Sequence, residues 1–331
     1  ESIKKSPIAF EPVLGKALSD DWAATGELAE LLKGIGGCSP YLNEILRQEQ
    51  EWISDAVFAH DPLKKMVLGE LGGDPGKTLR QAKRRVAGYL ALAELSGAYS
   101  LTETTQYLTD FADMAVAAAF KSALSPYRAS GKISSDDDIF IIAMGKMGAR
   151  ELNYSSDIDL IVMFDDRNMD QVQSAQLRQV LVRATRSAIK LLSEVTEYGY
   201  VFRTDLRLRP DPSVTPICVG MTSALEYYES LGRTWERAAY IKARFCAGNY
   251  EAGTDFLKQM VPFVWRRYLD FSAIEEAHEL RLKIRQKTGI QNVSSIRGHD
   301  IKLGRGGIRE IEFFTQTRQL ISGGRDPELR E

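Results

Sequence analysis

The stretch from Met144 to Phe164 constrains the fold and the chemistry of this chain more than any other part of it. Its sequence is MGKMGARELNYSSDIDLIVMF, and it overlaps the end of the apolar run Ile139–Met144. This order of residue types indicates a strand, a tight turn containing Gly145 and Gly148, and a second strand that carries two aspartates. The pattern predicts a glycine turn that can approach a phosphate, followed by a strand that presents carboxylates.

Asp157 and Asp159 are expected to lie on one face of the second strand, because successive side chains of a strand point to opposite faces. Two like charges at this spacing repel, and a bound cation is the simplest reason to keep them. Mg²⁺ prefers carboxylate oxygens together with substrate phosphates. The pair therefore favours metal-assisted phosphoryl or nucleotidyl transfer. The alternative is that both carboxylates only face solvent at a strand end.

Length and charge exclude several classes of protein. With 331 residues the chain can form two or three domains, and its net charge of −2 argues against a general nucleic-acid binder or a membrane-surface binder. No apolar run approaches the roughly 18 residues of a membrane span. No export leader is recognisable, so we expect a cytoplasmic protein. The chain does not begin with Met and stops after a helical pattern, as a piece of a longer protein would.

Cysteine and histidine are too scarce and too scattered for a disulfide framework or a zinc site. These residues are Cys38, Cys218, Cys246, His60, His278 and His299.

Residues 1–130 are predicted to be a helical amino-terminal region. Apolar residues recur at helical spacing in Asp20–Leu32, Tyr41–Phe58 and Thr78–Ser96, with Gly- and Pro-containing turns between them. Ser125–Asp138 is the clearest linker. We therefore expect three parts: residues 1–130, a core at 131–220 and a helical domain at 221–331.

The core is predicted to contain three strands. Two are Ile139–Met144 and Ile158–Phe164, and a long helix, Gln171–Tyr198, separates them from a third at Tyr200–Arg209. In that third segment Asp205 alternates with arginines on the polar face. The expected fold class is α+β, mostly helical, with a small mixed sheet.

The carboxy-terminal part is predicted to be helical. Ser223-x-x-Glu226 and Ser272-x-x-Glu275 have the form of capping boxes, and Gly289 is suited to end the second helix.

Cationic side chains are concentrated after the core. On a predicted helix at Gly232–Cys246, a narrow stripe is formed by Arg233, Arg237, Tyr240 and Arg244. Lys242 falls among apolar residues of this helix and either snorkels outward or reaches into a site. The alternative reading of the stripe is an ordinary solvated helix face.

A glycine-rich turn, Leu303–Gly307, precedes a helix predicted from Ile308, and Lys302 and Arg305 flank it. Such a turn is typical of a helix start that receives an anion. On that helix Glu312 could line a cleft, whereas Glu310 is expected to face solvent or to pair with Arg309. Asn153 and Ser156 are expected to shape the turn before the two aspartates.

A small-residue turn followed by Asp-x-Asp between apolar residues resembles the polymerase-β-like nucleotidyltransferase superfamily. That resemblance implies a third carboxylate on a later strand, and Asp205 matches it; the alternative is an ion pair of Asp205 with Arg203 or Arg207. This chain has Gly145-Lys146 where the superfamily usually has Gly-Ser or Gly-Gly.

The wider sequence resembles the bifunctional glutamine synthetase adenylyltransferase/adenylyl-removing enzymes. The resemblance rests on four blocks in order: MGKMGARELNYSSDIDL, FRTDLRLRP, YYESLGRTWERAAYIKAR and IKLGRGGIREIEFFTQTRQLISGGRDP. Members carry two related nucleotidyltransferase domains. The forms GRTWER, IKAR and GGIREIEF resemble the amino-terminal, adenylyl-removing copy.

The resemblance implies phosphorolysis of adenylyl-tyrosine on glutamine synthetase by inorganic phosphate, which gives ADP and regulates nitrogen assimilation. It implies Mg²⁺, with Mn²⁺ as a substitute, bound by Asp157, Asp159 and Asp205, and it suggests a PII signalling protein as a second partner. Phosphate is already ionised near neutral pH, so cations are needed more than a strong base. Expected contacts to nucleotide or phosphate are Gly145, Lys146, Ser156, Arg207, Arg237, Lys242, Lys302 and Arg305.

Two alternatives remain open from the sequence. One keeps the fold and reverses the direction, giving ATP-dependent adenylylation of glutamine synthetase or transfer to another acceptor. The other is a non-catalytic regulatory module that binds glutamine synthetase or PII.

Overall fold

The computed structural model describes residues 3–57, 73–133, 139–266 and 299–330. The fold is α+β and mostly helical with a small mixed sheet, as predicted. The chain divides into two compact units, and each is described by itself. The first unit comprises residues 1–136, 149–159 and 180–205, and the second comprises residues 137–148, 160–179 and 206–331. The three-part division expected from the sequence stays a prediction.

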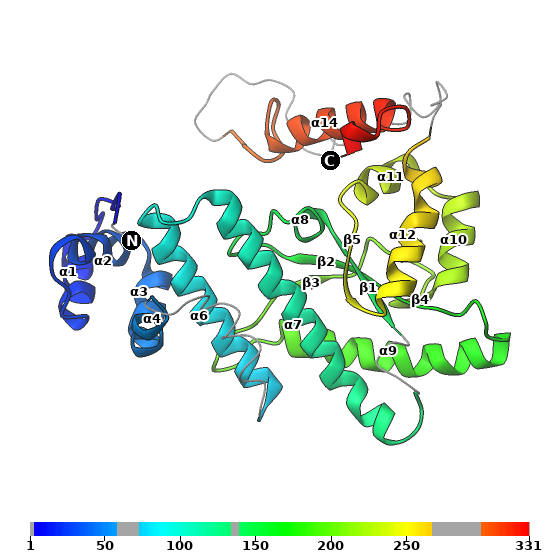
Figure 1. The fold of residues 1–331 in the computed structure, drawn as a ribbon, viewed down its shortest axis with the longest axis horizontal. Helices are drawn as coiled ribbons and strands as arrows, with labels where there is room; N and C mark the ends of the chain where they lie inside the picture. The colour runs from blue at the N-terminus through cyan, green and yellow to red at the C-terminus, as the bar shows by residue number, and fades with distance from the viewer. Residues whose placement is uncertain (1–2, 58–72, 134–138, 267–298, 331) are drawn as a thin grey trace. The chain divides into compact units, whose positions relative to one another are not determined.

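The first unit is built mainly from helices at the amino-terminal end of the chain (Figure 1). They are α1 (Pro12–Asp21), α2 (Gly26–Cys38), α3 (Pro40–Gln48), α4 (Gln50–Val57), α6 (Pro75–Leu95) and α7 (Leu101–Ala129). Proline occupies the first turn of α1, α3 and α6, where its missing N–H costs no hydrogen bond. Ser100 and Glu103 form a capping box at the start of α7. One apolar cluster lies among α1, α2, α3, α4 and α6: Leu18, Leu31, Leu32, Ile35, Leu46, Ile53 and Leu92.

Helix boundaries in this unit differ from the predicted ones. The predicted Asp20–Leu32 falls partly on α1 and partly on α2, because Ala23 and Gly26 adopt positive φ and end the first helix. The predicted Tyr41–Phe58 divides between α3 and α4 at Glu49, whose backbone departs from helical geometry; Phe58 lies outside the described residues.

The linker expected at Ser125–Asp138 begins later than predicted. Helix α7 continues through Pro126 to Ala129, and residues 134–138 lie outside the described part of the chain.

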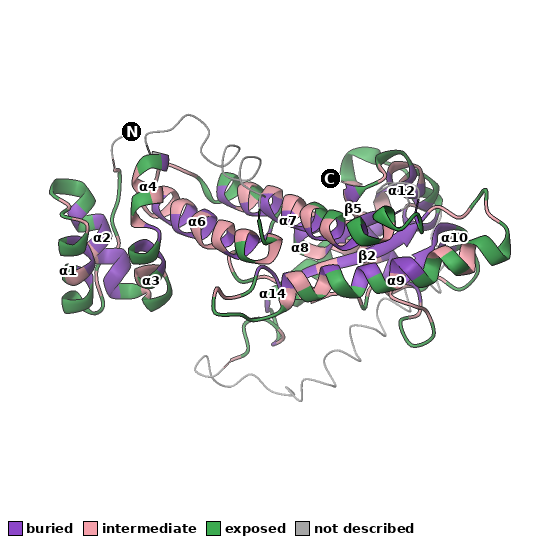
Figure 2. Ribbon diagram, turned by 90° about the horizontal axis from the view of Figure 1, so that it is seen from below, coloured by how far each residue is buried: buried purple, intermediate pink, exposed green. Residues whose placement is uncertain are grey.

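The sheet contains β1 (Phe140–Met144), β2 (Ile158–Phe164), β3 (Thr204–Asp205), β4 (Cys218–Gly220) and β5 (Arg244–Gly248) in the order β3-β2-β1-β5, with β4 also paired to β2. β2 is parallel to β3 and to β4, whereas β1 is antiparallel to β5, so the sheet is mixed. Strand β2 carries buried side chains along nearly its whole length (Figure 2). In the first unit, β3 pairs with the beginning of β2.

In the second unit, helices pack against the remaining strands of the sheet. These helices are α8 (Gly145–Gly148), α10 (Met221–Ser230), α11 (Thr234–Tyr240), α12 (Tyr250–Val264) and α14 (Ile308–Ser322), followed by η2 (Pro327–Arg330). Helix α9 (Gln171–Ser193) contributes residues to both units. α10 and α12 lie side by side and enclose an aromatic core with β1 and β5 (Figure 1), in which Tyr228 contacts Tyr240 and Phe263.

The predicted strand Tyr200–Arg209 is wrong over most of its length, since only Thr204–Asp205 is a strand. Before it, the amides of Val201 and Phe202 both donate to the carbonyl of Leu192 at the end of α9. After it, the guanidinium of Arg209 donates to the backbone carbonyls of Leu206, Pro212 and Thr215 and closes a compact turn. The alternating pattern therefore marks two anchoring loops around a very short strand.

The predicted helix Gly232–Cys246 is also wrong in extent. Helix α11 covers Thr234–Tyr240 alone, and Arg244–Gly248 forms β5 against β1. The chain segment is drawn into the sheet because its residues supply the antiparallel partners of Phe140–Ala143.

The capping box predicted at Ser223 is wrong, and the one predicted at Ser272 is not tested. Helix α10 begins at Met221 with Gly220 as its N-cap, so Ser223 lies inside it. Ser272, Glu275 and Gly289 lie outside the described residues. The helix predicted at Gln171–Tyr198 ends earlier, at Ser193. No helix among the described residues is long and apolar enough to cross a membrane.

Lys83 is a charged residue that is buried among apolar side chains of the first unit. Its side chain is 7 % exposed, and its ammonium lies 4.0 Å from the ring centroid of Phe202 and 5.9 Å from that of Phe111. Burial, and secondarily the positive charge of Arg203, lowers the pKa of Lys83 to about 7. The buried charge is a cost that the aromatic faces offset only in part.

We predict that Lys83→Met stabilises the protein by on the order of 2 kcal/mol at pH 6.5, because it removes a buried charge. The unfolded chain keeps its lysine protonated up to about pH 10. The folded protein releases that proton near pH 7. Wild-type stability should therefore rise with pH across this window and the advantage of Lys83→Met should shrink. Urea unfolding at pH 6.5, 8 and 9.5 measures both quantities.

The matched control is Lys121→Met, at an exposed position on α7. Its effect should be small and independent of pH. A Lys83→Met effect that is equally flat with pH would contradict the explanation.

Candidate active site

Two of the three predicted carboxylates lie on neighbouring strands near the start of β2. Asp159 of β2 and Asp205 of β3 are directly opposite one another in a parallel pair. Their side chains therefore project from the same face of neighbouring strands, which are spaced about 4.8 Å apart in sheets. Both residues are partly buried. Carboxylate oxygens on one edge of a sheet are the ligand type that a divalent cation such as Mg²⁺ prefers.

Asp157 is placed on the same face by its spacing from Asp159, but its carboxylate is already paired. The Nε of Arg203 donates to Oδ1 of Asp157 at 2.5 Å. The other two guanidinium nitrogens donate to the hydroxyl of Tyr200 at 2.9 Å and to the carbonyl of Ser155 at 2.7 Å. The hydrogen bond to Asp157 is the main cause that raises the pKa of Arg203. One arginine thus joins the carboxylate to the loop before it and to the loop before β3.

The pairing follows from the register. Ile158 lies opposite Thr204, so Asp157 comes opposite Arg203 just as Asp159 comes opposite Asp205. Sequence reasoning considered Arg203 only as a partner of Asp205 and missed Asp157. The signal was the matching spacing of Asp157 and Asp159 with Arg203 and Asp205.

The carboxylates of this face are suitable ligands for a divalent cation, provided that Asp157 is released from Arg203. Within the described ranges, no three His, Cys, Asp or Glu side chains converge closely enough to hold a metal ion. The backbone brings the three aspartates to one edge, while the ion pair turns the carboxylate of Asp157 toward Arg203. Since the pair is about half exposed on both sides, exchanging the guanidinium for another cation costs little.

The turn before β2 is held by Asn153. Its Oδ1 accepts hydrogen bonds from the amide of Ser155 at 3.2 Å and from the hydroxyl of Ser156 at 2.9 Å. This is an Asx turn, and it confirms that Asn153 and Ser156 shape the approach to the aspartates.

In the second unit, the glycine turn of the motif is the single helical turn α8. Gly145 has a φ of 57°, which favours glycine, and Lys146 is exposed. A Cβ on Gly148 would lie 1.8 Å from the carbonyl oxygen of Lys242. The second glycine is therefore required by packing against the segment before β5.

The expected arginine stripe does not exist as a surface. Arg237 is 2 % exposed, and its Nε donates at 2.9 Å to the carbonyl of Phe263 near the end of α12. Arg244 donates to the carbonyls of Met147 and Gly148. Both guanidinium groups hold backbone segments of the second unit together.

Lys242 reaches toward α14. Its Nζ pairs with Oε1 of Glu312 at 2.8 Å. Lys242, expected either to snorkel outward or to reach into a site, is thus the partner of Glu312, which was expected near a cleft.

The start of α14 is less open to an anion than predicted. The amides of Gly307, Ile308 and Arg309 donate to carbonyls of the preceding loop, and the amide of Gly306 donates to Glu310. The expectation that Glu310 faces solvent or pairs with Arg309 did not anticipate this contact. Of the cationic residues predicted to contact nucleotide or phosphate, Lys146, Arg207, Lys302 and Arg305 are exposed.

Comparison with known proteins adds to this geometry. The profile of the glutamate-ammonia ligase adenylyltransferase family matches residues 32–259, which is most of the chain and includes all three aspartates. The chain belongs to this family. A second profile, that of GlnD PII-uridylyltransferase, matches residues 275–330.

Curated relatives of this adenylyltransferase family member carry the name bifunctional glutamine synthetase adenylyltransferase/adenylyl-removing enzyme. The relative from Bradyrhizobium sp. (strain ORS 278) is 42 % identical over 97 % of this chain and 34 % of its own length. That from Rhizobium meliloti (strain 1021) is 50 % identical over 76 % of the chain and 26 % of its own length. That from Rhodopseudomonas palustris is 45 % identical over 98 % and 36 %, respectively. The chain spans about a third of the length of these relatives.

We predict that Gly148→Ala destabilises the protein by about 3 kcal/mol. The new methyl group would overlap the backbone carbonyl of Lys242, which cannot easily move. Chemical denaturation measures the change. Gly131→Ala is the comparison: its φ of 69° is strained for alanine but its surroundings are open, so it should cost only about 1 kcal/mol. Equal effects would show that Gly148 has room for a side chain.

Proposed function

We propose that this chain is a nucleotidyltransferase domain that removes adenylyl groups from a tyrosine of glutamine synthetase. The observation that carries the proposal is the parallel register that sets Asp159 beside Asp205 with Asp157 on the same edge. Membership of the glutamate-ammonia ligase adenylyltransferase family supports the reaction class and glutamine synthetase as the substrate. We propose the cytoplasm as the location and a PII signalling protein as a regulatory partner.

The direction of transfer is supported by sequence forms. The segments GRTWER, IKAR and GGIREIEF resemble the adenylyl-removing copy of the family more than the adenylylating copy. The relatives' names include both activities, so ATP-dependent adenylylation is the second candidate.

Mg²⁺ or Mn²⁺ is the proposed cofactor, with Asp157, Asp159 and Asp205 as its ligands. Such an ion supplies positive charge to the phosphate oxygens that become more negative during transfer. Asp157 has a second task in this proposal, because it must leave Arg203 to join its two companions. Arg203 then remains beside the site as a fixed positive charge held by Ser155 and Tyr200.

The reaction that we propose is a displacement at phosphorus. An oxygen of inorganic phosphate forms a bond to the AMP phosphorus while the bond from that phosphorus to the tyrosine oxygen breaks. The products are ADP and tyrosinate, and the tyrosinate takes a proton from solvent because its pKa is about 10. The proposed phosphate and nucleotide contacts are Gly145, Lys146, Ser156, Arg207, Lys302 and Arg305. Arg237 and Lys242 are not among them, since the guanidinium of Arg237 binds backbone carbonyls and the ammonium of Lys242 pairs with Glu312.

The decisive assay gives the purified chain adenylylated glutamine synthetase, phosphate and Mg²⁺ and measures ADP. We expect ADP release, with a loss of about 100-fold or more in Asp157→Asn, Asp159→Asn and Asp205→Asn. Asp20→Asn, at an exposed position on α1, is the matched control and should keep full activity.

The same preparation distinguishes the alternatives. Incubation with labelled ATP and unmodified glutamine synthetase should leave the protein unlabelled; labelling would establish adenylylation instead. Turnover in neither direction, together with failure to bind Mn²⁺, would identify a binding module.

Arg203→Gln should raise the affinity for Mn²⁺ roughly two- to fivefold, since it removes the cation that competes for Asp157. Titration followed by electron paramagnetic resonance of free Mn²⁺ measures this. Arg47→Gln removes an arginine that is paired with Asp21 on α1 and should change nothing. Weaker Mn²⁺ binding in Arg203→Gln would show that Arg203 supports the site rather than competing for it.

A further inference from the structure

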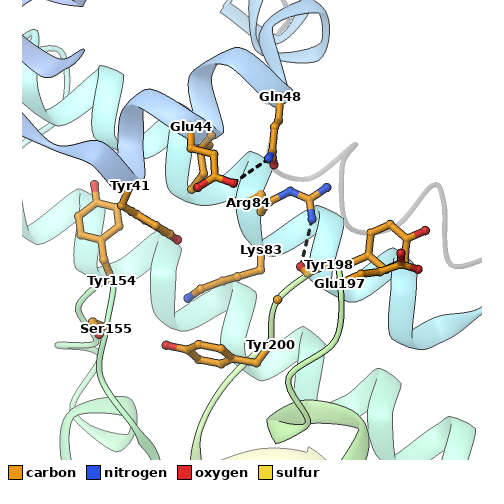
Figure 3. A pocket seen from close by; sticks show the side chains of 12 residues that line it. Tyr41, Glu44, Gln48, Lys83, Arg84, Tyr154, Ser155, Glu197, Tyr198 and Tyr200 are labelled. Carbon is orange, nitrogen blue, oxygen red and sulfur yellow. Dashed lines mark hydrogen bonds between the residues drawn. The ribbon is translucent and has the colours of Figure 1, made fainter. Parts of the chain in front are cut away.

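The first unit contains a pocket that the proposed reaction does not use. It lies between helices α3 and α6 and the two loops at Tyr154–Ser155 and Glu197–Tyr200 (Figure 3). Its volume is about 490 Å³, within the range of pockets that enclose small organic molecules. All of its lining residues belong to the first unit.

Lys83 supplies an unsatisfied charge at the inner end of this pocket. Its side chain is more than nine-tenths buried, and its ammonium points to the side on which Tyr154, Ser155 and Tyr200 lie (Figure 3). Among the residues that the structure describes, no hydrogen-bond acceptor or carboxylate contacts this ammonium, and the rings of Phe111 and Phe202 lie beside it. An ammonium offers three donors, and leaving them unused in a buried place is costly.

The other charges of the pocket do not neutralise Lys83. Glu49 is buried, and its carboxylate is shared by Arg84 and Arg85 at 2.9 Å each. The carboxylate of Glu49 is therefore already occupied by two guanidinium groups. Glu44 and Glu197, which unlike Glu49 line the pocket, are both exposed, and Glu44 accepts a hydrogen bond from Gln48. The interior is positive and the rim is negative, which favours a guest with one negative charge at its inner end.

The walls are aromatic. Tyr41, Tyr154 and Tyr200 line the pocket and offer flat apolar faces to an organic body, whereas the ammonium of Lys77 lies over the ring of Tyr198. Burial raises the pKa of Tyr41 and of Tyr154, so these phenols stay neutral near pH 7. The hydroxyl of Tyr154 donates to Glu94 and that of Tyr200 accepts from Arg203, which fixes both rings.

We propose that this pocket is a binding site for a small organic monocarboxylate, whose carboxylate binds the ammonium of Lys83 while its body lies among the tyrosine rings. A single charge fits better than the double charge of a phosphate ester, because Glu44 and Glu197 stand at the rim. The three aspartates do not line this pocket, and the proposal does not depend on the reaction assigned to them.

The test is calorimetric titration of the full chain with phenylacetate, phenyl phosphate and the neutral phenylacetamide at pH 6.5, below the pKa of about 7 of Lys83. Phenylacetate should bind saturably, at least tenfold more tightly than phenylacetamide and more tightly than phenyl phosphate. Lys83→Met should weaken phenylacetate binding at least tenfold, while Lys121→Met on the exposed face of α7 leaves it unchanged. Circular dichroism and urea unfolding confirm that both variants are folded.

A second variant, Tyr41→Ala, keeps the proposal testable if Lys83→Met does not fold. Tyr41 is half exposed on α3, so Tyr41→Ala should be tolerated; it should weaken phenylacetate binding three- to tenfold and leave acetate binding unchanged. Tighter binding of phenyl phosphate would overturn the monocarboxylate assignment. Absence of saturable phenylacetate binding, or equal binding by wild type and Lys83→Met, would overturn the site and leave Lys83 as a lysine held only by aromatic rings.

Discussion

The short parallel pairing of β3 with the start of β2 is the contact on which the proposed chemistry depends. It contains only two register pairs, one of which sets Asp159 opposite Asp205, and its continuation by one residue brings Asp157 to the ion pair with Arg203. Like charges side by side oppose the pairing, so other bonds must hold it. The amide of Ile158 donates to the carbonyl of Arg203, and the residues before β3 are tied to the end of α9 at Leu192. The polar edge is thus stabilised by backbone bonds on both sides of it.

Much of the fold could be predicted where the local pattern and the tertiary environment agree. Strand β1 is an apolar run that is buried throughout, and β2 is apolar and buried except at Asp159, so their bounds were predicted almost correctly. Helix α6 carries apolar residues at helical spacing and was predicted for the same reason. The failures lie where two structures suit one sequence. Residues 244–248 continue a helical pattern from α11, but pairing with β1 makes them a strand, and that partner lies about a hundred residues earlier.

The candidate site shows the same division. Asp157 and Asp159 were accessible to sequence reasoning because two carboxylates in an apolar strand are rare. Asp205 was identified from an alternation that proved to be mostly loop, and the two residues that do form a strand include it. Arg237 could not have been placed, since an arginine on a helical stripe normally faces water, whereas here the end of α12 offers it carbonyl acceptors. Lys83 gave no signal, because the ring that covers it, Phe202, is distant in the sequence.

The three bonds made by Arg203 have a thermodynamic consequence. The same guanidinium fixes Tyr200, which is part of the pocket wall, and neutralises Asp157, which is part of the acidic edge. Any occupant that moves Tyr200 changes how firmly Asp157 is held, and any ion that draws Asp157 away changes how firmly Tyr200 is held. Reciprocity then requires that each event alter the free energy of the other by the same amount. A single side chain is sufficient to transmit that dependence across the first unit.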